Sequence, residues 1–323
     1  MAPDIRPSRV AQGDQSLSAS FFMDNAENKN MIGLALGSGS AFGMAHIGVL
    51  NVLEKEKIPI GIVSGASIGA LIAAMWGIGL SSLEIQKISE RLKIKLNIIR
   101  LLDFTFPISG LLAGRRLRRF LKAILRESTF DDLKVPVKII AYDLANRETV
   151  VVDKGRLLDA VYKSIAVPGI FQPIMEDGRM FVDGGILDPV PVDILFKSGA
   201  KKVIAVNVLP GPKNIYERNM ALKEVLKEEE NVLRQGSLDE KICVHLTRFF
   251  RKMFTPNIFD VIMTSMQAME YSIAEINCCR ADVSLHPVLS NATSIDFHLI
   301  KQFVRIGEEE TLRNIDKIRA LTT

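Results

Sequence analysis

Residues 60–77 of this 323-residue chain read IGIVSGASIGALIAAMWG and combine the patterns of a strand, a tight turn and a helix in 18 residues. Ile60–Ser64 is an apolar run of strand length, Gly65–Ser67 has the residues of a tight turn, and Ile68–Gly77 is an apolar run long enough for a helix. The five residues from Gly65 to Gly69 form the G-x-S-x-G pattern of a strand-to-helix turn that exposes a serine hydroxyl. The stretch therefore predicts Ser67 as a nucleophile.

The surroundings of this motif distinguish it from a chance match in a chain with 22 glycines. Gly65 and Gly69 lack the Cβ atoms that would clash with neighbouring backbone at a sharp turn. The helix that follows presents unpaired N–H groups and the positive end of its dipole, both of which stabilise an oxyanion. We therefore expect acyl-transfer chemistry at this turn.

Strand-like and helix-like segments alternate on both sides of this stretch. Ile32–Leu36 is typical of a buried strand and precedes a helix from about Gly43 to Lys57. Further strands are expected at Val135–Tyr142, Glu148–Val152 and Lys202–Leu209. This alternation predicts an α/β fold with a mostly parallel central sheet covered by helices on both faces, a three-layer α/β/α arrangement.

The two ends of the chain differ in character from this core. Residues 1–30 are polar and mixed in charge, so we expect a flexible N-terminal tail ahead of a catalytic core at residues 31–210. Residues 211–323 are helix-rich and follow without a Pro/Gly linker, so we expect them to pack on the same domain. Met31–Leu53 and Ile58–Leu83 contain no charged residue, but their Gly and Ser clusters favour strand, turn and helix over a membrane span.

Composition narrows the class of protein. With 48% hydrophobic and 24% charged residues the chain is typical of a folded protein, and a net charge of +4 without an RNA or DNA motif predicts no nucleic-acid partner. The three cysteines, Cys243, Cys278 and Cys279, show neither metal-ligand spacing nor an even count, which indicates a reducing compartment. Because the opening residues lack a signal-peptide core, we expect a cytoplasmic protein.

A serine nucleophile needs a base, and histidine is the usual one. The chain has four histidines: His46, His245, His286 and His298. None has the loop setting of a triad histidine, and His46 lies in an apolar helical run. Asp183 is the other candidate, because it ends an apolar stretch and is followed by two glycines that would let the Ser67 turn approach. An ordinary Asp-Gly-Gly turn explains the same residues, and a histidine-triad esterase for small esters also stays open.

The sequence GSGSAFG at residues 37–43 places small residues between a strand and a helix, where consecutive N–H groups can point at an anion. A dinucleotide fingerprint needs glycine where Phe42 stands, and a P-loop needs a lysine that is absent. We therefore expect the backbone of Ser38, Gly39 and Ser40 to form an oxyanion hole. This chemistry requires neither a metal nor a cofactor.

In their order along the chain these motifs resemble those of the patatin-like phospholipase family. The family pattern is a Gly-rich loop before HIGVL, here His46–Leu50, then G-x-S-x-G, then Asp-Gly-Gly, here Asp183–Gly185. Further similarity lies in SIAVPGIF at Ser164–Phe171 and in DPVP at Asp188–Pro191. The resemblance covers roughly residues 31–210 and is strongest to small cytoplasmic bacterial members.

This resemblance implies a patatin-like fold and a catalytic dyad of Ser67 and Asp183 without histidine. It also implies hydrolysis of a phospholipid or another acyl lipid. One departure concerns the loop, where the family carries Gly-Gly-Gly-x-Arg/Lys-Gly and residues 38–43 read SGSAFG. Phe42 replaces the basic residue, which predicts reduced activity or a narrower substrate range. The alternative is therefore a catalytically weak regulatory or membrane-binding protein on the same scaffold.

The segment from Glu84 to Glu127 is strongly basic, with eleven Lys or Arg against four Asp or Glu, an excess of +7. Within it, apolar residues recur at helical spacing opposite a basic face: Leu117, Phe120, Leu121, Ile124 and Leu125. Two interpretations stay open. One is peripheral contact with an anionic membrane surface, and the other is the solvated face of an ordinary core-packed helix.

Overall fold

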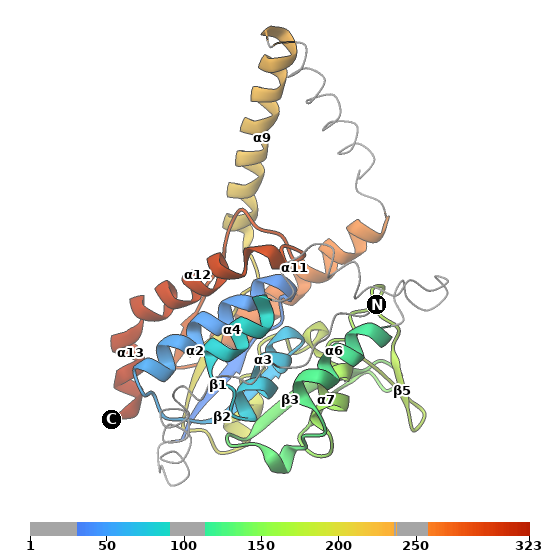
Figure 1. Ribbon diagram of the computed structural model, residues 1–323, viewed down its shortest axis with the longest axis vertical. Coiled ribbons are helices and arrows are strands. Elements are labelled where there is room, and N and C mark those ends of the chain that lie inside the picture. The colour runs from blue at the N-terminus through green and yellow to red at the C-terminus, as the bar shows by residue number, and fades with distance from the viewer. Residues whose placement is uncertain (1–30, 91–113, 236, 238–257) are drawn as a thin grey trace.

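The computed structural model (Figure 1) describes residues 31–90, 114–235, 237 and 258–323. Their strands form one eight-stranded sheet in the order β5-β6-β3-β2-β1-β7-β8, with β4 paired to β3. The strands are β1 (Ile32–Leu36), β2 (Ile60–Ala66), β3 (Val137–Asp143), β4 (Glu148–Val152), β5 (Ile174–Glu176), β6 (Arg179–Asp183), β7 (Lys202–Val206) and β8 (Val283–Leu285). The pairs β1–β2, β1–β7, β2–β3 and β7–β8 are parallel, whereas β4, β5 and β6 pair antiparallel with their neighbours.

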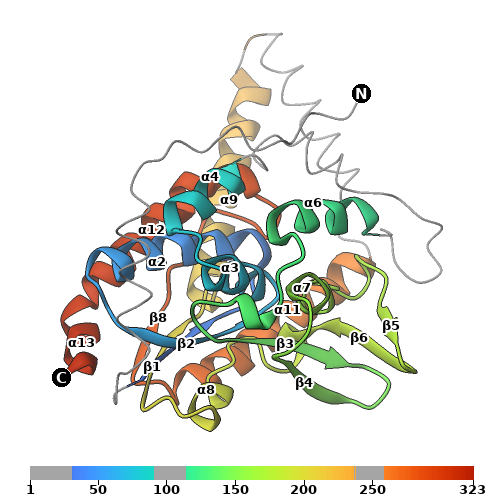
Figure 2. The same cartoon turned by 60° about the horizontal axis from the view of Figure 1, so that its bottom comes forward.

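The centre of the sheet is buried on both faces. All five residues of β1 are buried between β2 and β7, which explains why this strand reads as a continuous apolar run. Figure 2 shows the antiparallel strands β4, β5 and β6 gathered at one end of the sheet, beyond β3.

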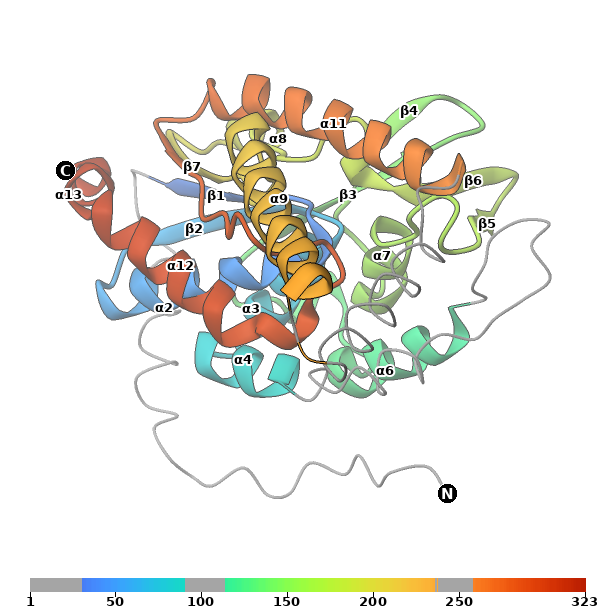
Figure 3. The same ribbon diagram turned by 90° about the horizontal axis from the view of Figure 1, so that it is seen from above.

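Helices cover both faces, and Figure 3 shows the three layers from above. On one face lie α2 (Ala45–Lys55), α3 (Ile68–Gly77), α4 (Ser82–Glu90), α6 (Arg115–Leu125), α7 (Leu157–Ser164) and α12 (Ile300–Arg313). On the other face lie α8 (Asp193–Lys197) and α11 (Ile258–Cys278). The predicted three-layer α/β/α fold with a mostly parallel sheet is confirmed.

The remaining described elements are short helical turns and two helices of the C-terminal part. They are η1 (Ser40–Met44), η2 (Phe130–Asp132), η3 (Gly184–Ile186), η4 (Phe297–Leu299), η5 (Ala320–Thr322), α9 (Pro212–Gln235) and α13 (Ile315–Arg319). Helix α9 extends away from the rest of the molecule, whereas α11 and α12 pack on opposite faces of the sheet (Figure 1). The division at residue 210 stays a prediction, and the predicted tail at 1–30 lies outside the described residues.

Several predicted elements agree with the structure residue for residue: the strands Ile32–Leu36 and Glu148–Val152 and the helix Ile68–Gly77. The expected strand at Lys202–Leu209 is shorter, because β7 ends at Val206. Met31–Leu53 and Ile58–Leu83 both form a strand, a turn and helices as predicted. Among the residues described, no helix combines the length and the apolar character that crossing a bilayer requires.

The apolar side of α6 packs onto the core. Leu121 and Leu125 are fully buried, and Leu117, Phe120 and Ile124 pack against the same core from half-buried positions. The stripe that the sequence showed is therefore a core face, and only the basic side of α6 reaches solvent.

Helices α12 and α2 cross so closely that their backbones are in contact. A Cβ atom on Gly48 would lie 1.9 Å from the carbonyl oxygen of Val304, and one on Gly307 would lie 2.1 Å from that of Ala45. Both glycines are therefore required by close approach rather than by backbone conformation. The crossing attaches the C-terminal part to the helix that carries the HIGVL motif.

We predict that Gly307→Ala lowers the free energy of unfolding by about 1 to 3 kcal/mol, the usual range for overpacking. The added methyl group has no space against the Ala45 carbonyl, and this loss outweighs the higher helix propensity of alanine. Chemical denaturation provides the measurement, with Lys301→Ala on the solvent side of α12 as the control. A Gly307→Ala protein as stable as the unmodified protein would contradict the crossing.

Candidate active site

The sheet brings the carboxyl ends of two strands together on one edge of β3. β4 pairs with β3 from Ile139 to Asp143 and so occupies one edge. β2 and β6 therefore share the opposite edge, with β2 parallel and β6 antiparallel to β3. Since they run toward each other, their last residues meet.

The register of β3 locates this meeting point. Ala66, the last residue of β2, pairs with Ile140, and Asp183, the last residue of β6, pairs with Ala141. The next residue after β2 is Ser67. The sequence predicted both Ser67 and Asp183 as site residues, and the structure brings them together here.

Ser67 occupies a sharp turn between β2 and α3, with φ 54° and ψ −123°. A residue with a side chain rarely adopts this conformation, so the surroundings must hold it. A Cβ atom on Gly69 would lie 2.1 Å from the Leu36 carbonyl oxygen, and one on Gly65 would lie 2.6 Å from that of Gly69. The two glycines of the motif thus admit neighbouring backbone, as the sequence predicted.

The glycines after Asp183 lie against β3 and the Gly-rich loop. A Cβ atom on Gly184 would lie 2.2 Å from the carbonyl oxygen of Ile140, and one on Gly185 would lie 2.8 Å from Ser38 Oγ. The nearest atoms to each added Cβ belong to β3, to the Gly-rich loop and to Asp183 itself, because β6 ends directly beside β3. The Ser67 turn also lies close to the carboxylate, since the Ser67 hydroxyl lowers the pKa of Asp183.

The Asp183 carboxylate is buried and only half satisfied. Its Oδ1 accepts a hydrogen bond of 2.7 Å from the Gly185 N–H, whereas Oδ2 has no partner with full hydrogen-bond geometry among the described residues. Burial raises the pKa of Asp183 to about 6, although the nearby Ser67 hydroxyl and the Gly185 N–H lower it. At neutral pH the group is an ionised carboxylate with one oxygen available beside the serine.

The Gly-rich loop follows β1 and lies beside both groups. The Ser38 N–H donates to the Pro189 carbonyl over 2.8 Å, so the expectation that this N–H faces an oxyanion was wrong. Within the described residues, no backbone carbonyl engages the N–H groups of Gly39 and Ser40. These two donors remain for an anion, and the hydroxyl of Ser38 is buried without a partner there.

A segment near the C-terminus holds the far end of this loop. The Ser294 carbonyl accepts hydrogen bonds from the Ser40 hydroxyl at 2.7 Å and from the Ala41 N–H at 3.1 Å. Gly39 is also confined, since a Cβ atom there would lie 2.5 Å from Val208. Sequence reasoning missed Ser294, because nothing in its local sequence indicates a contact 254 positions away.

His46 supports the loop and is not a base. Its Nε2 lies 2.8 Å from the Gly37 carbonyl oxygen, which can only accept, so Nε2 carries the proton. Burial lowers the pKa of His46 to about 4, so the ring is neutral at physiological pH. His286 and His298 are near Glu275 and Asp296, and His245 lies outside the described residues. None of the three described histidines is a hydrogen-bond partner of Ser67.

Phe42 occupies the position where a basic residue was expected. Its side chain is 3% exposed, and its ring meets that of Phe303 edge to face at 5.9 Å between centroids. The loop is therefore anchored on α12 by apolar packing, where a basic side chain would otherwise fix it.

Glu270 on α11 is a group near the site that the sequence did not single out. Burial and the charge of Asp183 raise its pKa to about 8, so it is largely protonated at neutral pH. A glutamate in the middle of a helix gives no sequence signal for such a position.

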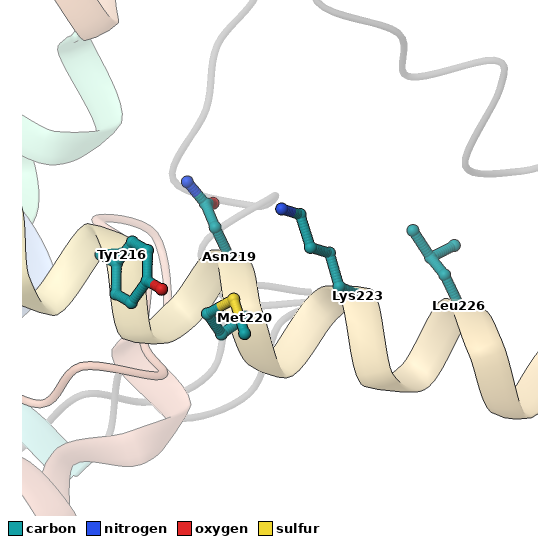
Figure 4. Close-up of a pocket in the computed structure, with 5 residues that line it drawn as sticks. All are labelled: Tyr216, Asn219, Met220, Lys223 and Leu226. Carbon is teal, nitrogen blue, oxygen red and sulfur yellow. The ribbon is translucent and has the colours of Figure 1, made fainter.

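Two surface hollows lie away from the dyad. One of about 330 Å³ has five described lining residues, all on α9, which Figure 4 shows along one side of that helix. The other, of about 420 Å³, is polar and includes Leu209, Glu275 and His286. Neither contains Ser67 or Asp183.

The family comparison agrees with the order of the motifs. The model of the family described as patatin-like phospholipase matches residues 34–196, half of the chain. The chain belongs to the patatin-like phospholipase family. The match ends within α8, so the family model spans the Gly-rich loop, the elbow and Asp183 but not the helices after β7.

Several relatives of this chain are much longer proteins, of which it spans less than a fifth. Neuropathy target esterase sws of Drosophila melanogaster is 31% identical over 186 residues, 55% of this chain and 13% of its own length. Lysophospholipase NTE1 of Meyerozyma guilliermondii is 26% identical over 284 residues, 85% of this chain and 18% of its own. VipD of Legionella pneumophila matches in structure with a TM-score of 0.47 and 14% identity, covering 89% of this chain and 67% of its own.

We predict that Asp183→Asn makes the protein more stable above pH 6. Because the folded-state pKa is raised from 3.8 to about 6, the folded protein binds more protons than the unfolded chain between these values. The free energy of unfolding therefore falls as pH rises from about 4 to about 6. Asparagine stays neutral and avoids this loss, which is on the order of 3 kcal/mol at about 1.4 kcal/mol per pKa unit.

Thermal unfolding from pH 4 to pH 8 provides the measurement. Ser67→Ala keeps the carboxylate and should keep the decline between pH 4 and pH 6. An Asp183→Asn protein that is less stable than the unmodified protein at pH 8 would contradict this prediction. It would show that the surroundings of Asp183 stabilise its negative charge.

Proposed function

We propose that this protein is a serine hydrolase of carboxylic esters in phospholipids or other acyl lipids, with Ser67 as nucleophile and Asp183 as its base. The observation that carries the proposal is the buried Asp183 carboxylate at the end of β6, which meets the end of β2 beside Ser67; its Oδ2 has no hydrogen-bond partner among the described residues. Family membership supports the same class of chemistry.

The proposed reaction has two steps. Ser67 Oγ attacks the ester carbonyl carbon while its proton moves to Asp183 Oδ2, and the negative oxygen is stabilised by the N–H groups of Gly39 and Ser40. The tetrahedral intermediate collapses, and Asp183 returns the proton to the departing alcohol. Water, deprotonated by Asp183, then attacks the acyl-serine carbonyl, and the fatty acid leaves as Ser67 regains its proton.

The substrate class follows from the relatives. One relative is named a lysophospholipase and another an esterase, so we take a lysophospholipid as the first substrate to test. The competing function, a catalytically weak regulatory or membrane-binding protein, rests on the missing basic residue at Phe42. The burial of Phe42 against Phe303 gives the loop another anchor and favours the enzyme.

We further infer that the protein contacts anionic membranes through charge. Arg115, Arg116 and Arg119 are exposed on the outer face of α6, and each basic residue near an anionic surface contributes on the order of 1 kcal/mol. Arg118 on the same helix pairs with Asp159 at 2.8 Å and lies over the Tyr162 ring. Because the apolar face of α6 packs on the core, the contact is electrostatic and does not insert the helix.

We predict that Ser67→Ala and Asp183→Asn each abolish fatty-acid release from a lysophospholipid while the proteins remain folded. Their effects should not add in the double variant, because the two residues act as a unit. The rate should also fall as pH drops below about 6, where Asp183 becomes protonated. Release of fatty acid, measured by mass spectrometry, provides the readout.

The histidines provide the matched controls for this experiment. Substituting His245, His286 and His298 singly should leave measurable turnover. A folded variant of one of them with as little activity as Ser67→Ala would establish a histidine base. A purified protein whose small activity does not depend on Ser67 would favour the regulatory alternative.

We predict that the double variant Arg116→Glu, Arg119→Glu binds vesicles containing phosphatidylserine at least about tenfold more weakly at low salt. Arg116→Lys, Arg119→Lys keeps the charge and should bind like the unmodified protein. Co-sedimentation at 0.1 M and 1 M salt provides the measurement, because the Debye length falls from about 10 Å to about 3 Å. Equal binding to neutral and anionic vesicles at both salt concentrations would leave these arginines as a solvated helix face.

A further inference from the structure

One buried hydroxyl joins the nucleophile turn to the neighbouring strand. Ser164, the last residue of α7, is fully buried. Its Oγ accepts a hydrogen bond of 2.9 Å from the Ser67 N–H and donates one of 2.6 Å to the Ile140 carbonyl. The direction of both bonds is fixed, since a backbone N–H can only donate and a carbonyl can only accept.

The Ser164 hydroxyl lies where the pairing between β2 and β3 ends. The last pair between β2 and β3 is Ala66 with Ile140, and the following residue of β3 pairs with Asp183 of β6. Ser67 therefore turns away with φ 54° and no ladder bond to hold its N–H. The bridge through Ser164 connects Ser67, the residue after the last paired residue of β2, to Ile140 of β3.

The same segment also holds the other half of the dyad. The Ala166 carbonyl accepts a hydrogen bond of 3.0 Å from the Asp183 N–H. The anchor of the nucleophile and the anchor of the base thus lie only two positions apart along the chain. A shift of residues 164–166 would change the distance between Ser67 Oγ and Asp183 Oδ2.

We propose that Ser164 is a positioning residue that sets the Ser67 hydroxyl against Asp183. The inference rests on the proposed hydrolase function, because the position of Ser67 affects turnover only if Ser67 reacts. Ser164 touches neither the ester nor the transferred proton. It acts through the Ser67 backbone, whose N–H it engages.

Replacing Ser164 by alanine leaves the Ser67 N–H and the Ile140 carbonyl buried without partners. The turn can satisfy them only by moving, and a displacement of about 1 Å at reacting atoms reduces a rate about 100-fold. Substrate binding does not involve Ser164, so KM should stay nearly constant. A role in stability alone would lower the unfolding temperature without this loss of turnover.

Ser64 on β2, the strand that leads into the Ser67 turn, provides a matched control. Its side chain is also fully buried, and its Oγ donates to the Pro191 carbonyl over 2.6 Å. Ser64→Ala thus removes a buried hydroxyl and one hydrogen bond to a carbonyl, but it leaves the Ser67 N–H engaged.

The experiment measures kcat and KM for a soluble p-nitrophenyl ester, together with the unfolding temperature. We expect Ser164→Ala to lower kcat about 30- to 100-fold with KM within about twofold, and Ser64→Ala to keep kcat within about threefold. Ser164→Thr keeps the hydroxyl and should recover most of the rate. If Ser164→Ala does not fold, Ser164→Cys, with its weaker donor and acceptor, should give an intermediate kcat.

Two outcomes would overturn the inference. One is a folded Ser164→Ala or Ser164→Cys protein with unchanged kcat, and the other is an equal loss of kcat in Ser64→Ala. Failure of the proposed function has a different signature, because Ser67→Ala would then hydrolyse the ester as fast as the unmodified protein.

Discussion

Two strands that end against each other on one edge of β3 place the two groups of the candidate site. β2 arrives parallel and β6 antiparallel, so Ser67 and Asp183 meet at adjacent positions of β3. The meeting requires close backbone contacts that only glycine allows, at Gly69 beside β1 and at Gly184 beside β3. A side chain at either position would push a strand end away, and the two groups would separate.

The site is built largely from backbone and neutral groups around one carboxylate. His46 is neutral because burial lowers its pKa to about 4, and Phe42 adds only apolar contact. Glu270 is largely protonated near neutral pH because burial and the charge of Asp183 raise its pKa to about 8. In such surroundings the Asp183 carboxylate is a stronger base than an exposed aspartate, which suits proton transfer from a serine without histidine.

The local sequence predicted the secondary structure around the site residues better than it predicted the tertiary contacts of these residues. The strand, turn and helix around Ser67 follow from apolar runs and glycines, and the structure agrees with them closely. The short strands β5 and β8, of three residues each, have too few residues for a pattern. The partners of the Gly-rich loop, Pro189 and Ser294, depend on tertiary packing, so the sequence wrongly assigned the Ser38 N–H to the oxyanion. Glu270 was missed for the same reason.

A crystal structure of the protein after reaction with a fluorophosphonate would show whether Ser67 and Asp183 act together. We expect the phosphorus atom on Ser67 Oγ, a phosphoryl oxygen within hydrogen-bond distance of the Gly39 and Ser40 N–H groups, and Asp183 Oδ2 beside the Ser67 oxygen. The adduct on another serine, or a histidine beside Ser67 in place of Asp183, would contradict a dyad formed by the ends of β2 and β6.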